Sequence, residues 1–88
     1  MTEGQIRFEL MVNDYPDIAC YWDFDAMKVT IKTSEGLPLS KGECLMVDFF
    51  LSVWFGRNTS FDFIKAAGVL SNNNKKVISD WFLSPFWP

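Results

Sequence analysis

The 88-residue sequence predicts one α+β domain spanning residues 1–88. In the first third of the chain, apolar and polar residues alternate with the period of two that is typical of half-buried strands. The middle of the chain instead carries a helix-capping pattern and a long apolar segment, and two shorter amphipathic segments follow. A chain this short has too little interior for a second core. These observations predict a three-stranded antiparallel meander followed by three helices packed on one face.

The three predicted strands cover about residues 5–12, 18–24 and 27–33. Apolar side chains recur at every second position in each of them: Ile6, Phe8, Leu10 and Val12; Ile18, Cys20, Trp22 and Phe24; Met27, Val29 and Ile31. Residues 13–17 are rich in turn-favouring types, and a second turn is expected near Asp25. Short connections of this kind join neighbouring antiparallel strands.

The first predicted helix covers residues 41–55. Ser40 and Glu43 have the spacing of a capping box, in which each side chain binds the backbone amide of the other residue. Gly56 supplies the left-handed residue that ends many helices. Nearly all positions between these signals are apolar, which predicts a central helix covered on most sides. A buried strand over residues 44–55 is the alternative, and it would leave the capping pattern unexplained.

Two shorter helices are predicted over residues 60–70 and 75–83. Thr59 or Ser60 is the expected N-cap of the first, and Asn74 is the expected N-cap of the second. The side chains expected to face the core are Phe61, Ile64, Ala67 and either Val69 or Leu70 in the first helix, and Val77, Ile78, Trp81 and Phe82 in the second.

The sequence lacks the usual catalytic motifs. It contains no histidine, which removes the usual general base at neutral pH and the commonest metal ligand. The five glycines are scattered, so they form neither a phosphate-binding loop nor a dinucleotide-binding fingerprint. The aspartates between residues 14 and 25 lack the spacing of a calcium loop. We therefore expect no catalysis, no metal site and no cofactor. An unusual carboxylate- or metal-dependent enzyme is the alternative.

Charge and hydropathy narrow the kinds of partner. The eight basic residues are spread from Arg7 to Lys76 without a basic patch, and the net charge is −3, so direct nucleic-acid binding is not expected. Cys20 and Cys44 lie in apolar runs and are expected to be buried free thiols, with one disulfide as the alternative. The longest apolar segment, residues 44–55, is well short of the roughly 20 residues that span a bilayer. The N-terminus also lacks a signal-peptide pattern, so a cytoplasmic protein without membrane contact is expected.

Acidic residues are concentrated at the start of the chain. Residues 1–27 contain six acids and one base, a net charge of −5, whereas residues 28–88 have a net charge of +2. The predicted partner-binding surface comprises Glu9, Asp14, Tyr15, Asp17, Tyr21, Asp23 and Asp25. Such a surface attracts a basic protein at long range, and tyrosine adds rigid contact area. Solubility of an exposed sheet explains the same charge equally well.

The C-terminal aromatic residues offer an alternative interface. Phe86 and Trp87 follow a proline near the end of the chain, where segments stay mobile unless they dock. Exposed tryptophan is a frequent binding hot spot, so this tail would bind a partner or pair the chain with a second copy as a homodimer.

The leading functional hypothesis is a small cytosolic inhibitor or regulator of the immunity, antitoxin or phage counter-defence type. It would bind a protein with a basic surface through its acidic aromatic face. The alternative is a structural or assembly subunit, or a chaperone-like adaptor, held by the C-terminal aromatics.

Overall fold

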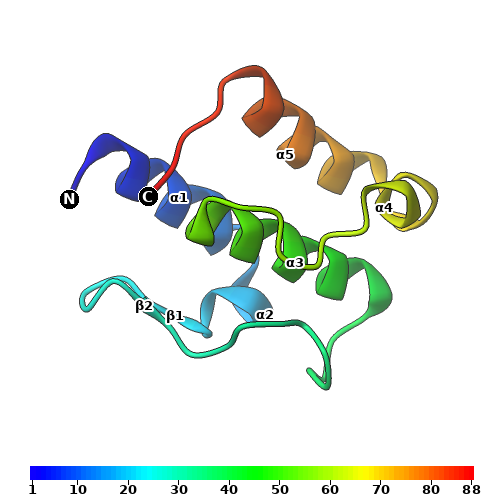
Figure 1. The fold of residues 1–88 in the computed structure, drawn as a ribbon, viewed down its shortest axis with the longest axis horizontal. Helices are drawn as coiled ribbons and strands as arrows, with labels where there is room; N and C mark the ends of the chain where they lie inside the picture. The colour runs from blue at the N-terminus through cyan, green and yellow to red at the C-terminus, as the bar shows by residue number, and fades with distance from the viewer.

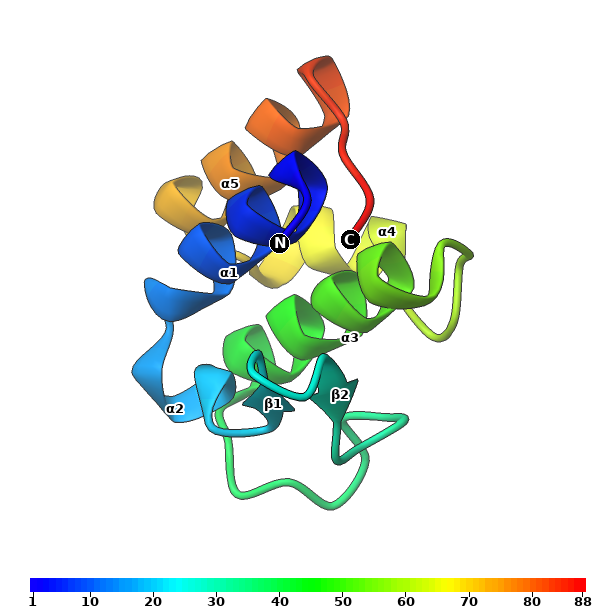
Figure 2. The ribbon, with the colours of Figure 1, turned by 90° about the vertical axis from the view of Figure 1, so that its left-hand side faces the viewer.

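The computed structural model describes all 88 residues and confirms the α+β class, with five helices and one two-stranded antiparallel sheet. The elements in chain order are α1 (Glu3–Asn13), α2 (Pro16–Ala19), β1 (Trp22–Asp23), β2 (Lys28–Val29), α3 (Lys41–Phe55), α4 (Phe63–Val69) and α5 (Asn72–Leu83). Helix α3 runs through the middle of the molecule, with α5 on one side and α2 and the β1–β2 hairpin on the other (Figures 1 and 2).

The predicted strand over residues 5–12 is wrong, because this segment forms most of helix α1. Thr2 Oγ1 accepts a hydrogen bond from the Gln5 backbone N–H at 3.1 Å, and Gln5 Oε1 accepts one from the Thr2 backbone N–H at 3.0 Å. This reciprocal capping box fixes the start of the helix. Phe8 and Val12, one turn apart, are both fully buried. The apolar alternation was misleading because positions four residues apart share a face in a helix as well as in a strand.

The three-stranded meander is not confirmed, and only a short hairpin forms from the other two predicted strands. Within the predicted strand 18–24, the first residues complete helix α2, whose Pro16 already has the φ angle of a helical first turn. Asp23 Oδ1 accepts hydrogen bonds from the backbone N–H groups of Asp25 and Ala26, so a turn follows β1 at once. Of the predicted strand 27–33, only β2 remains, paired in antiparallel register with β1.

The predicted helix over residues 41–55 is confirmed with the same boundaries. Ser40 Oγ accepts from the Glu43 backbone N–H, and Glu43 Oε1 accepts from the Ser40 backbone N–H, both at 3.1 Å. Gly56 ends the helix in the left-handed region, with φ of 68°. Every residue from 45 to 51 is buried, so α3 is the central helix. The alternative of a strand over residues 44–55 is wrong.

The two C-terminal helices exist but begin at other residues than predicted. Helix α4 starts at Phe63, because the Asp62 carboxylate accepts from the Lys65 backbone N–H and acts as the N-cap. Helix α5 starts at residue 72, because the Ser71 hydroxyl accepts from the Asn74 backbone N–H. No residue of α5 is fully buried. This helix therefore lies on the outside of the domain and keeps part of its apolar surface open.

An aromatic cluster centred on Phe8 joins α1, the hairpin and α3. The Phe8 ring centroid lies 5.3 Å from that of Trp54, 5.7 Å from Trp22, 6.2 Å from Phe24 and 6.4 Å from Phe50. These separations fall in the range in which tilted and edge-to-face ring pairs attract each other. Both cysteines are free, as predicted, although Cys20 is exposed rather than buried.

Asp48, a buried carboxyl group on α3, holds the loop that precedes this helix. Its Oδ1 accepts a hydrogen bond from the Ser34 backbone N–H at 3.3 Å. Burial raises the pKa of Asp48, and hydrogen bonds from Ser34 offset only part of this effect. The folded protein therefore keeps the Asp48 proton to a higher pH than the unfolded chain does.

This raised pKa predicts a pH-dependent difference between wild type and an Asp48→Asn variant. The stabilising contribution of protonated Asp48 is present at low pH and is lost as pH rises through the folded-state pKa. The amide stays neutral and keeps an oxygen for the Ser34 N–H. Urea unfolding between about pH 4 and pH 7 should show the variant gaining stability relative to wild type as pH rises. A constant difference across this range would contradict the assignment.

Candidate protein-binding groove

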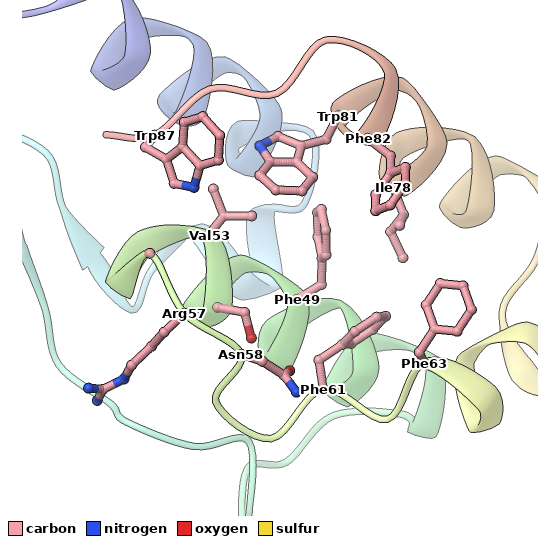
Figure 3. Close-up of a pocket in the computed structure, with 12 residues that line it drawn as sticks. Phe49, Val53, Arg57, Asn58, Phe61, Phe63, Ile78, Trp81, Phe82 and Trp87 are labelled. Carbon is pink, nitrogen blue, oxygen red and sulfur yellow. The ribbon is translucent and has the colours of Figure 1, made fainter.

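A groove opens between α5 and the segment that joins α3 to α4 (Figure 3). Its volume is about 320 Å³. We call it the aromatic groove, and its hydrophobic lining residues are Phe49, Val53, Phe61, Phe63, Ile78, Trp81, Phe82 and Trp87. Pockets of this size with mostly apolar walls are typical of binding sites in proteins.

The floor of the aromatic groove is held in place by the central helix. The Phe49 ring from α3 lies edge-to-face against both Phe61 and Trp81, with ring centroids 5.7 Å apart in each pair. Figure 3 shows these three rings converging from α3, from the α3–α4 segment and from α5. Phe49 is buried, and Phe61 and Trp81 are partly buried against the core, so the floor of the groove is anchored in the core.

The rim of the groove consists of aromatic rings that face water. Phe63, at the start of α4, is 64% exposed; Phe82, in the last turn of α5, is 73% exposed; and Trp87 is 58% exposed. A smaller groove of about 200 Å³ continues between α4 and α5 and shares Phe61, Phe63 and Ile78 with the first. The two grooves together form one continuous apolar surface, the kind of patch that marks contact sites.

The C-terminal tail, residues 84–88, is docked against α1 and α5. The Arg7 guanidinium donates a hydrogen bond to the Ser84 carbonyl oxygen at 2.9 Å and lies 4.5 Å from the centroid of the Phe86 ring. The Trp81 indole N–H donates to the Phe86 carbonyl oxygen at 2.9 Å. Of the two predicted tail residues, Phe86 therefore makes contacts within the chain, whereas Trp87 lines the aromatic groove, edge-to-face with Trp81.

The predicted acidic residues do not share a sheet face, because Glu9 lies on α1 and Asp23 lies on the hairpin. Asp14, Asp17, Asp23 and Asp25 are all exposed, and Glu9 is half-exposed. None of them forms a salt bridge, since the single salt bridge of the chain lies on α5. The carboxylates therefore remain available to a basic partner, but on separate elements.

The two tyrosines predicted for this surface pack toward the interior. The Tyr15 hydroxyl donates a hydrogen bond to Asn74 Oδ1 at 2.6 Å, and its ring lies edge-to-face against Phe50. Burial, and to a lesser degree the nearby Asp14 carboxylate, raise the pKa of Tyr15. Tyr21 is half-buried against the hydrophobic core. Tyr15 thus ties the α1–α2 junction to α5, and the acidic surface lacks protruding aromatic rings.

Sequence reasoning missed Phe63 as a surface residue and placed Phe82 on the buried face of its helix. The predicted core positions Ile64 and Ala67 are exposed, whereas Ala66 is buried, and Leu70, one of the two alternatives predicted for the end of this helix, is buried as well. One signal was present in the sequence. Residues 63–64 and 82–83 are adjacent apolar pairs, and neighbouring helical positions point about 100° apart, so on a helix at the surface at least one member of such a pair can be left exposed.

The structure shows no group of three or more cysteine and carboxylate side chains placed to hold a metal ion. None of its helices combines the length and the apolar character needed to cross a membrane. Neither a family model, nor a curated protein, nor a solved structure matches this chain.

Proposed function

We propose that the protein acts by binding another protein, as an inhibitor or adaptor, and that its aromatic groove holds an apolar segment of that partner. The observation that carries this proposal is the exposure of Phe63, Phe82 and Trp87 around a floor that is anchored in the core by Phe49. Large aromatic rings in a water-excluding pocket supply most of the binding energy in many interfaces. A small cytosolic regulator of the immunity, antitoxin or counter-defence kind would use such a surface to cover a functional site.

Binding explains the groove better than catalysis does. The groove lining offers few polar groups. One of them, the Ser52 hydroxyl, is already engaged within the chain, because it donates a hydrogen bond to the Asp48 carbonyl oxygen at 2.9 Å. The same Ser52 oxygen accepts from the Thr59 backbone N–H at 3.1 Å. A catalytic serine would need a base within hydrogen-bond reach, and the chain contains no histidine.

The acidic end of the molecule is a second candidate surface. Its support is the set of four exposed aspartates without salt bridges on α2, the hairpin and the turn before α2. Exposed charges of one sign speed the encounter with a basic protein more than they tighten the final complex. This surface would therefore steer a basic partner, whereas the aromatic groove would retain it.

The proposal predicts that shortening the rim rings removes the partner without unfolding the protein. In affinity capture from the native host, a Phe63→Ala/Phe82→Ala variant should enrich the partner at least about tenfold less than wild type, because hot-spot truncation costs 2 kcal/mol or more. Both rings are mostly exposed, so the circular dichroism spectrum should be unchanged.

The matched control removes exposed apolar area elsewhere. Ile6→Ala/Leu10→Ala truncates two exposed side chains on α1, and this variant should capture the partner as wild type does. If the groove variant and the control retain the same proteins at equal levels, the aromatic groove is not the binding surface.

A further inference from the structure

The charges around the aromatic groove are of opposite sign to those of the rest of the chain. The segment from residue 56 to residue 83 carries four cations and two carboxylates, a net charge of +2, whereas the remaining residues have a net charge of −5. No carboxylate lines either the aromatic groove or its continuation between α4 and α5. The cations that line them are Arg57 in the first and Lys75 in the second.

The two carboxylates of this segment are already engaged within the chain. Asp62 caps α4 through the Lys65 backbone N–H at 2.9 Å, and Asp80 forms a salt bridge with Lys76 at 2.8 Å. Arg57 and Lys75 form no salt bridge. Figure 3 shows the Arg57 side chain extending away from the ring cluster, at the edge of the groove. An acidic group on a partner would therefore meet these cations at the rim, beside its apolar anchors.

We infer that the aromatic groove binds an amphipathic helix of a partner protein that carries carboxylates next to its apolar residues. This inference rests on the proposed function of the groove. The groove and its continuation are lined by residues of α5 and α4. An elongated apolar surface of this kind suits a partner helix that presents anchors at positions i, i+3 or i+4, and i+7. Strand addition is not favoured, because the sheet has two strands of two residues each and lies on the other side of α3 (Figure 2).

A partner helix also fits better than a second copy of this chain. The acidic end that would complement the groove lies on α2 and the hairpin, across α3 from α5 (Figure 1). A contact between the groove of one copy and the acidic end of the next would join two different surfaces, so it would be heterologous. Such contacts propagate into open filaments unless their rotation closes a ring, whereas a separate partner helix occupies the groove as a single complex.

The test uses two synthetic helical peptides with identical apolar anchors, one with glutamate and the other with lysine at the flanking positions. Fluorescence anisotropy of labelled peptides measures their affinity for the full-length protein. At low salt the glutamate peptide should bind about tenfold more tightly than the lysine peptide, and added salt should reduce this difference. Phe82→Ala should weaken the binding of the glutamate peptide.

Charge reversal at the rim separates electrostatic recognition from apolar binding. Arg57→Glu/Lys75→Glu changes two exposed side chains and should abolish or reverse the preference for glutamate. The control Lys28→Glu changes an exposed cation on the hairpin and should leave the preference unchanged.

Three results would overturn the inference. Equal affinity or a preference for the lysine peptide, with binding still lost in Phe82→Ala, would show that the groove binds helices without selecting acidic ones, and the proposed function would stand. No binding of either peptide, while a captured protein partner still requires Phe82, would exclude a helical occupant. Dimerisation of the chain that requires Phe82 would make a second copy the occupant.

Discussion

Replacement of Phe8 by alanine should lower the free energy of unfolding by about 3–5 kcal/mol, the usual cost of removing a buried aromatic ring. Phe8 is fully buried and contacts four other aromatic rings, which come from the hairpin region and from α3. Small domains have total stabilities of only about 5–15 kcal/mol. The variant should therefore unfold at much lower urea concentrations than wild type, or be largely unfolded in buffer.

Leu10→Ala is the matched control for this prediction. In helix α1, Leu10 points away from Phe8 and is 64% exposed, so its truncation should change stability by less than about 0.5 kcal/mol. If this segment were a strand, Phe8 and Leu10 would share a buried face, and truncating either side chain would lower the free energy of unfolding by a similar amount. Urea unfolding followed by tryptophan fluorescence therefore distinguishes the helix from the strand: comparable losses in both variants would contradict helix α1.

Gly4→Ala should destabilise the protein although glycine normally weakens a helix. A methyl group at this position in α1 would overlap the carbonyl oxygen of Trp87 in the docked tail. That atom belongs to the backbone, so it moves only if the tail moves. Overpacking typically costs about 1–3 kcal/mol, which exceeds the 0.5–1 kcal/mol or so that alanine gains over glycine in a helix.

Gly68→Ala is the control for the Gly4 substitution and should have the opposite sign. A methyl group there meets no atom within 4 Å, so the variant in α4 should gain about 0.5–1 kcal/mol. Thermal unfolding measures both stabilities, and acrylamide quenching of the four tryptophans should increase if the tail, with Trp87, moves away from α1. Stabilisation by both substitutions, with unchanged quenching, would contradict the docked position of the tail.

Local capping signals predicted the central helix α3 well, but they did not give the starts of α4 and α5, which are capped by Asp62 and Ser71. The pair Ser40 and Glu43, together with Gly56, gave both ends of α3, because hydrogen-bonded caps and a left-handed residue depend only on nearby sequence. The same reasoning missed α1, although Thr2 and Gln5 form the same type of capping box. The period-two alternation of residues 6–12 fits a strand and one face of a helix alike, so this pattern alone could not reveal the helix.

The aromatic groove was harder to predict than the helices. Its walls come from α3, the α3–α4 segment, α4, α5 and the tail, so no single stretch of sequence contains it. The predicted tail residue Trp87 does line it, but the spacing of about 100° between helical side chains applies only to residues that are inside a helix. Because α4 starts at Phe63 rather than at residue 60, Phe61 lies outside the helix, and helical spacing could not place it relative to Phe63 and Ile64.

For the acidic surface, the sequence predicted which charged residues are exposed but not how the tyrosines pack. Charge density along the sequence correctly located exposed aspartates, because charged groups are rarely buried without a partner. The inward position of Tyr15 depends on Asn74, which is 59 residues away in the chain. Such long-range pairing is set by tertiary packing and leaves no local pattern to read.

The affinity of a purified, captured partner for wild-type and variant proteins tests most directly whether the aromatic groove retains that partner. Calorimetric titration should show that Phe63→Ala/Phe82→Ala weakens binding at least about tenfold. The variant Asp17→Lys/Asp25→Lys spares the turn-forming Asp23. It should slow association, and it should change the equilibrium affinity less than the groove variant does. Full affinity in the groove variant, with binding lost in the charge-reversed variant, would contradict the proposal and assign recognition to the acidic end.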